Sequence, residues 1–138
     1  MAKKKPRPAG VPAPYPLAMV ISDAIWRDPG SGKRTILGCF SVIHARQFPA
    51  VHPVMAVYVA VTDGRGKVPI ILQLVDVENE GEPLFRGEVE AQFRGPRVIV
   101  ELDFHIGGLT FPRAGEYRFQ LFASGEFLIE RRLLVVKI

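Results

Sequence analysis

Apolar and polar residues alternate with a period close to two through most of the chain. The clearest case is residues 97–106, where apolar side chains fill the even positions and polar or charged ones fill the odd positions, Ile99 excepted. Successive side chains of a strand point to opposite faces, so this pattern is typical of a strand with one buried face. No segment shows convincing helical periodicity. The sequence therefore predicts an all-β domain.

Eight strands are expected, separated by turn-forming clusters. They span residues 17–25, 35–43, 54–61, 68–75, 88–93, 97–106, 116–122 and 127–137. Several are apolar on both faces, which favours two packed sheets in an immunoglobulin-like antiparallel β-sandwich. An open barrel is the competing architecture, because its strand spacing is similar. Tyr117 follows a tight turn, where sandwich domains often fasten a corner through a tyrosine hydroxyl; an ordinary inward-facing aromatic is the alternative.

Four turns carry pairing predictions, and one of them, Ala123–Glu126, is expected to join the last two strands in a closing hairpin. Arg27–Gly32 is expected to close a hairpin, and Asp63–Gly66 to join residues 54–61 and 68–75 as a second one. If Arg94–Pro96 closes a third hairpin, the carboxylates of its two strands form one polar stripe on the outer sheet face. That stripe would contain Glu88, Glu90, Glu101 and Asp103.

Six segments of the sequence form a recognisable pattern: residues 16–23, 28–33, 36–40, 48–53, 74–76 and 111–119. Through these segments, most of the chain resembles a family of small bacterial proteins of unknown function. These segments consist mainly of turn and core residues. The resemblance implies a cytosolic, immunoglobulin-like β-sandwich, and it implies no activity and no catalytic positions.

The basic charge is concentrated at the N-terminus. The net charge is +4, and four cations lie in the first seven residues, leaving 14 basic residues against 14 acidic ones. Those four are Lys3, Lys4, Lys5 and Arg7. Residues 1–14 are rich in proline and are expected to form a disordered tail, with residues 15–138 as a single sandwich domain. Prolines replace the apolar stretch of a secretory signal, and no apolar run has the length of a membrane span, so a cytoplasmic location is expected.

Candidate chemistry is sparse. The single cysteine, Cys39, excludes an internal disulfide and is expected to be a small buried core residue. Gly30–Thr35 lacks the spacing of a phosphate-binding loop. The three histidines, His44, His52 and His105, lack the short spacing of metal ligands. No catalytic, cofactor-binding or metal-binding residues are therefore predicted, and no cofactor is expected.

The leading functional hypothesis is a non-enzymatic interaction or structural module that binds a protein partner, or a second copy of itself as a homodimer, through a sheet edge or loops. The candidate contacts are the loop residues Trp26, Phe48, Val51 and Phe111.

Two alternatives remain open. In the first, the basic tail binds a polyanion, either nucleic acid or an anionic membrane, with Arg131 and Arg132 as a second contact. In the second, a hydrolase-like enzyme has a polar site on the outer sheet face. That site would contain Glu101, Asp103 and His105.

Overall fold

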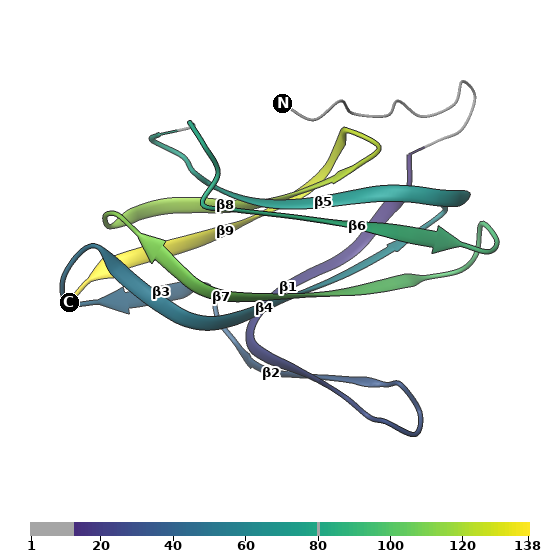
Figure 1. Ribbon diagram of the computed structural model, residues 1–138, viewed down its shortest axis with the longest axis horizontal. Helices are drawn as coiled ribbons and strands as arrows, with labels where there is room; N and C mark the ends of the chain where they lie inside the picture. Colours follow the sequence, from purple (N-terminus) through teal and green to yellow (C-terminus); the bar gives the residue numbers. More distant parts are fainter. Residues whose placement is uncertain (1–12, 80) are drawn as a thin grey trace.

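The computed structural model describes residues 13–79 and 81–138, which form nine strands and no helix. Two sheets pack face to face (Figure 1). The strands are β1 (Tyr15–Arg27), β2 (Arg34–Cys39), β3 (Val42–Ala45), β4 (Ala50–Thr62), β5 (Gly66–Asp76), β6 (Phe85–Phe93), β7 (Val100–Phe111), β8 (Gly115–Ala123) and β9 (Glu126–Lys137). Within the described residues, no helix is long and apolar enough to cross a membrane.

The strand order is β2-β1-β4-β7 in one sheet and β3-β9-β8-β5-β6 in the other. All pairings are antiparallel except that of β3 with β9, which is parallel. This arrangement confirms the immunoglobulin-like β-sandwich, with two separate sheets instead of a closed barrel. It also corrects the strand expected at residues 35–43. The chain leaves the first sheet after Cys39 and enters the second at Val42, so one predicted strand is two.

Two of the predicted hairpins are wrong. Asp63–Gly66 joins β4 to β5, and Arg94–Pro96 lies between β6 and β7, but each turn connects strands of different sheets. A short turn rich in glycine serves equally well to cross from one layer of a sandwich to the other. The carboxylates of β6 and β7 therefore lie on different sheets and form no common stripe.

The core lies between the sheets. It is formed by inward-facing side chains of both layers, with Val57 and Val59 of β4 facing the second sheet and Leu72 and Leu121 among the residues opposite. Tyr117, also fully buried, donates a hydrogen bond from its hydroxyl to the carbonyl oxygen of Arg113 at 2.7 Å. This bond confirms the tyrosine corner predicted from the position of Tyr117 after a tight turn.

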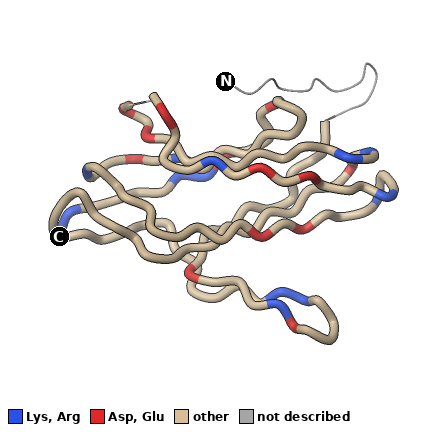
Figure 2. The backbone as a smooth tube through the Cα atoms, in the orientation of Figure 1, with Lys and Arg blue, Asp and Glu red and all other residues tan. Residues whose placement is uncertain are grey.

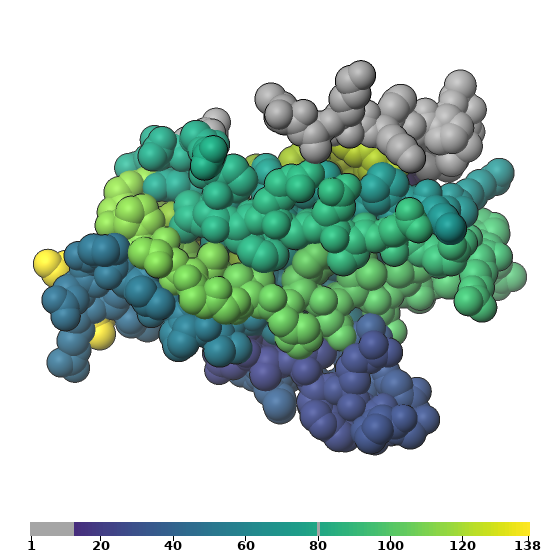
Figure 3. Space-filling view, in the orientation of Figure 1, coloured from purple at the N-terminus to yellow at the C-terminus, as the bar shows by residue number. Residues whose placement is uncertain are grey.

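One hairpin projects from the sandwich. β1 pairs with β4 only as far as Ser22, whose partner is Ala56; beyond that residue β1 pairs with β2 alone. Residues 23–38 therefore form a two-stranded arm, which projects on the outer side of the first sheet (Figures 1 and 3). The hairpin predicted at Arg27–Gly32 is confirmed. Its turn is closed by a 2.8 Å hydrogen bond from the Asp28 nitrogen to the Lys33 oxygen.

Candidate interaction site at the β1–β2 arm

The arm has an exposed outer face. In an antiparallel ladder, residues directly opposite each other share a face. Ala24 lies opposite Leu37 and Trp26 opposite Thr35, and all four side chains are exposed. Trp26 is 52% exposed and Leu37 is 50% exposed, so two large apolar side chains stand in solvent on one small surface. Such exposure is unusual for tryptophan and marks a candidate contact surface.

The β2 strand also presents a free edge. Among the described residues β2 pairs only with β1, so its other edge bears unpaired backbone groups. Thr35–Cys39 contains no charged residue and no proline, and in Figure 2 this part of the arm is tan between a red residue at the base and the blue residues nearer the tip. By contrast, the free edge strand β6 carries exposed charges at Arg86, Glu88 and Glu90, which protect an edge from pairing. β2 is thus an edge open to a further strand.

The inner face of the arm is fixed to the sheet below it. Arg34 donates from Nε to Oδ1 of Asp103 at 2.7 Å, and from Nη1 and Nη2 to a side-chain oxygen and the backbone oxygen of Glu101. The side chains of Arg34 and Asp103 are 11% and 10% exposed. Because water screens such a pair little, the arginine fork holds the arm against β7.

Tyr58 of β4 extends this polar cluster. Its hydroxyl donates a hydrogen bond to the carboxylate of Glu101. Burial of the phenol, followed by the hydrogen bond and the charge of Glu101, raises the pKa of Tyr58 to about 12. The phenol therefore stays protonated at neutral pH and remains a donor to Glu101.

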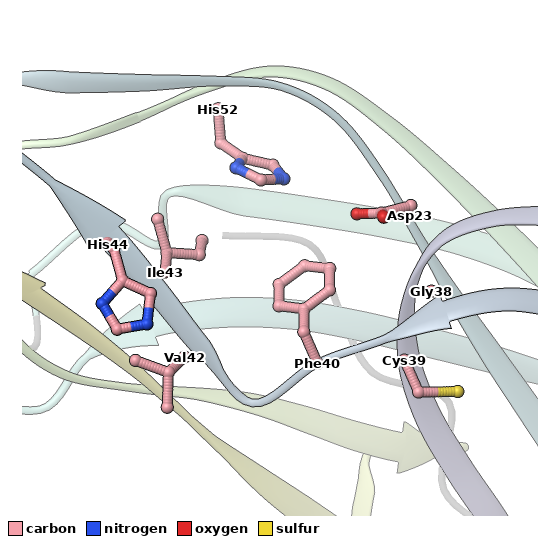
Figure 4. Close-up of a pocket in the computed structure, with 8 residues that line it drawn as sticks. All are labelled: Asp23, Gly38, Cys39, Phe40, Val42, Ile43, His44 and His52. Carbon is pink, nitrogen blue, oxygen red and sulfur yellow. The ribbon is translucent and has the colours of Figure 1, made fainter.

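A pocket of about 420 Å³ lies at the base of the arm. Strands β1, β2, β3 and β4 and the β2–β3 connection all contribute to its lining, because the chain passes here from one sheet to the other. Its residues are Asp23, Gly38, Cys39, Phe40, Val42, Ile43, His44 and His52 (Figure 4). The Phe40 ring lies 5.6 Å from the His52 ring, centroid to centroid. Asp23 supplies the one carboxylate of the lining.

Gly38 makes the position of the Asp23 side chain possible. Gly38 has a φ of +69°, in the left-handed region, and a Cβ built there would overlap with the Asp23 carboxylate. Glycine is required at this position for two reasons, the backbone conformation and the space. The carboxylate consequently lies over β2.

The pocket offers no metal centre. No group of three or more histidine, cysteine, aspartate or glutamate side chains within the described residues is arranged to hold a metal ion. Cys39 is exposed, which corrects its predicted burial in the core. In Figure 4 its sulfur points away from the two histidines. The strand expected around Cys39 is apolar on both faces, which predicts burial, but Leu37, Gly38 and Cys39 are all exposed in β2.

The family model that matches the chain covers residues 17–136. The chain belongs to the family of unknown function DUF6941. This assignment confirms the resemblance described above. No relative was found among curated proteins.

Solved structures similar to this DUF6941 member include an immunoglobulin-like protein from Pseudomonas aeruginosa. That match has 12% identity and a TM-score of 0.42, and covers 93% of this chain and all of that one. A second is the alkylpurine DNA glycosylase AlkC from Pseudomonas fluorescens, solved bound to DNA containing an abasic site analog. It has 11% identity and a TM-score of 0.43, and covers 85% of this chain and 30% of that one.

The four predicted partner contacts do not form one surface. Trp26 lies on the exposed face of the arm, whereas Val51, 65% exposed, lies at the start of β4. Phe48 is half-buried and packs against the core. The prediction that Phe111 is an exposed contact is wrong. Phe111 is fully buried, and its ring packs edge-on against that of Tyr117, with the centroids 5.0 Å apart. β7 continues five residues beyond its predicted end, so Phe111 is an inward-facing strand residue and not part of a loop.

The sequence analysis identified neither Leu37 as an exposed contact nor Arg34 as the residue that holds the arm. Leu37 belongs to a predicted strand that is apolar on both faces. Its alternation with Ile36 identifies two faces but cannot show that one of them lacks a covering layer. Arg34 shows no local signal at all, because its carboxylate partners lie more than 60 residues away in the sequence.

The structure describes only part of the residues named in the two alternative hypotheses. Lys3, Lys4, Lys5 and Arg7 lie outside the described residues. Arg131 donates to the Met19 oxygen at 3.0 Å and to Ser41 Oγ at 3.1 Å, and Arg132 forms an ion pair with Glu116 at 3.1 Å.

In the polar group suggested for an enzyme, Glu101 and Asp103 are both paired with Arg34. His105 is exposed on the same strand, opposite Ala56. The chain therefore belongs to a family of unknown function and has an immunoglobulin-like fold.

Proposed function

We propose that the protein is a non-enzymatic interaction module that binds a protein partner through the β1–β2 arm. The observation that carries this proposal is the coincidence on one hairpin of an uncharged free edge, Thr35–Cys39, with the exposed side chains of Trp26 and Leu37. An added strand would gain backbone hydrogen bonds from the edge and apolar contact from the outer face.

The arm meets the requirements of such a site. Tryptophan is enriched among the residues that dominate binding energy, and Trp26 is the single tryptophan of the chain. The Arg34 fork holds the arm in one position, which lowers the entropy lost on binding. Strand addition at a free edge also requires no pocket or cofactor.

A photo-crosslinking experiment tests the proposal. A benzoylphenylalanine probe replaces Leu37 in the full chain, produced in its native host, and a matched chain carries the probe at Phe127, an exposed apolar residue on β9 of the other sheet. We expect one discrete adduct from the Leu37 probe, absent with the Phe127 probe. A second substitution, Trp26→Asp, is expected to abolish that adduct while the circular dichroism spectrum stays unchanged.

The adduct also identifies the partner. A mass equal to two copies of the chain would reveal a homodimer, and any other mass a different protein. The proposal is wrong if both probe positions give the same products, or if Trp26→Asp leaves the Leu37 adduct intact.

A further inference from the structure

We infer that the strand added to β2 carries a lysine or arginine opposite Gly38, and that the cationic group of this residue pairs with the Asp23 carboxylate. The inference rests on the proposed function, and it states the chemistry of the partner: an extended protein segment with a basic residue at one defined position.

The register of the arm places the carboxylate. Ser22 lies opposite Cys39 and Ala24 opposite Leu37, so Asp23 and Gly38 lie opposite each other between these pairs. The Asp23 side chain lies over Gly38, in the space that a Cβ at position 38 would occupy. It therefore leans across β2 in the direction of the free edge.

A third strand would complete a row across the sheet. Neighbouring strands lie about 4.8 Å apart, and the residue opposite Gly38 would project from the same face as Asp23. Because Gly38 contributes no side chain, nothing in the middle strand separates the two outer side chains of this row. A long basic side chain spans that distance easily.

Charge favours a cation at this point. Among the described residues, Asp23 has no ion pair and donates or accepts no side-chain hydrogen bond, although it is exposed. Arg34, the cation on the same strand as Gly38, is engaged with Glu101 and Asp103.

The pocket lining suits the remainder of a basic side chain. Phe40 lines the same pocket as Asp23 (Figure 4) and offers an aromatic surface to the aliphatic stem. An arginine or lysine can also place its charge near the face of this ring. An acidic residue at the same position would face the Asp23 charge and be repelled.

Two short peptides test the inference on the full-length protein. One is the capped heptapeptide Thr-Val-Thr-Lys-Thr-Val-Thr, and the other has glutamate in place of lysine. Each is titrated into isotope-labelled protein while the backbone amide signals of β2 are followed by NMR. We expect the lysine peptide to shift the signals of Thr35–Cys39 and to bind about fivefold more tightly than the glutamate peptide, since exposed ion pairs contribute modestly.

Matched variants assign the difference to one carboxylate. Asp23→Asn is expected to bring the two peptides to equal affinity. Asp63→Asn, which makes the same charge change at an exposed position in the turn between β4 and β5, is expected to preserve the fivefold preference. Both variants are first shown to unfold at the same urea concentration as the unmodified chain.

Each result decides the inference. Equal affinity of the two peptides for the unmodified chain, with shifts in β2, would overturn the pairing with Asp23 while supporting strand addition at the arm. Shifts confined to another edge, or no shifts with either peptide, would overturn the inference as well. The Leu37 crosslinking result then shows separately whether the arm binds a partner.

Discussion

Arg34 and Asp103 lie on strands at opposite edges of the same four-stranded sheet, yet they are joined by a 2.7 Å hydrogen bond. In a flat sheet, three strand spacings would separate β2 from β7 by about 14 Å, which is beyond the reach of an arginine side chain. The bond exists because the arm folds across the outer face of its own sheet. That fold determines which face of the arm is exposed.

Replacing Arg34 by methionine is expected to loosen the arm without unfolding the sandwich. The change removes three hydrogen bonds to β7, and we expect the arm to open more easily by about 2 kcal/mol. Trp26, the single tryptophan, reports this directly as a lower fluorescence anisotropy, and amide exchange across the arm becomes faster. Lys33→Met removes a neighbouring exposed cation and should change neither quantity. An equal response of the two variants would show that Arg34 does not hold the arm.

Substituting Gly38 by alanine is expected to destabilise the protein more than the same substitution at Gly66. Both glycines have a left-handed φ, +69° and +65°, so both variants lose about 1 kcal/mol or more from backbone strain. Only at position 38 does the new Cβ meet a side chain, that of Asp23. Urea denaturation should therefore show a larger loss for Gly38→Ala. Asp23→Ala should reduce the excess, because it removes the carboxylate but keeps a Cβ 3.2 Å from the new one. If Gly38→Ala and Gly66→Ala lose the same free energy of unfolding, the contact with Asp23 does not affect stability.

The hydroxyl of Tyr117 is expected to stabilise the corner between β7 and β8. Tyr117→Phe keeps the ring that packs edge-on against Phe111 but removes the 2.7 Å hydrogen bond to the Arg113 carbonyl. The free energy of unfolding should fall by about 1 kcal/mol, as measured by urea denaturation. Tyr15→Phe, at a residue 60% exposed, serves as the control and should have no effect. A Tyr117→Phe variant as stable as the parent would contradict a structural role for this bond.

Tyr58 gives the stability a dependence on alkaline pH. Its pKa in the folded protein is about 12, above the value of 10.0 for an unperturbed tyrosine, because of burial and the bond to Glu101. The unfolded chain therefore loses this proton first, and the free energy of unfolding should fall as pH rises from 10 toward 12. The contribution is fully present below pH 10.

Spectrophotometric titration checks this value. The difference between the parent protein and Tyr58→Phe should show one phenol titrating near pH 12, and Glu101→Gln should lower that midpoint. A midpoint near 10 in the parent would show that Tyr58 is not buried against Glu101.

Much of the molecule could be predicted from local pattern. The alternation along residues 97–106 correctly separates inward-facing Phe104 and Ile106 from outward-facing Glu101 and His105. The position of Tyr117 after its turn correctly predicts the corner. These features depend on the two-residue period of a strand and on turn chemistry, which neighbouring residues determine.

The candidate site could not be predicted in the same way. Leu37 and Cys39 belong to an apolar stretch that looks like core, and only the departure of β1 from β4 after Ser22 leaves them exposed. The sequence predicts Phe111 in a loop because the strand expected there ends at residue 106, but the pairing of β7 with β4 continues through Gly107 to Phe111.

The sequence by itself determined an all-β chain, its family resemblance, the inward and outward faces of most strands and the turns between them. The tertiary structure alone decided which strands pair, where the chain changes sheet, and that Arg34 meets Asp103 while Asp23 lies over Gly38. The physical reason is the separation, along the sequence, of the residues that interact. Strand periodicity and turn geometry arise from residues close together in the chain, whereas sheet order, edges and ion pairs depend on segments that meet only when the two layers pack.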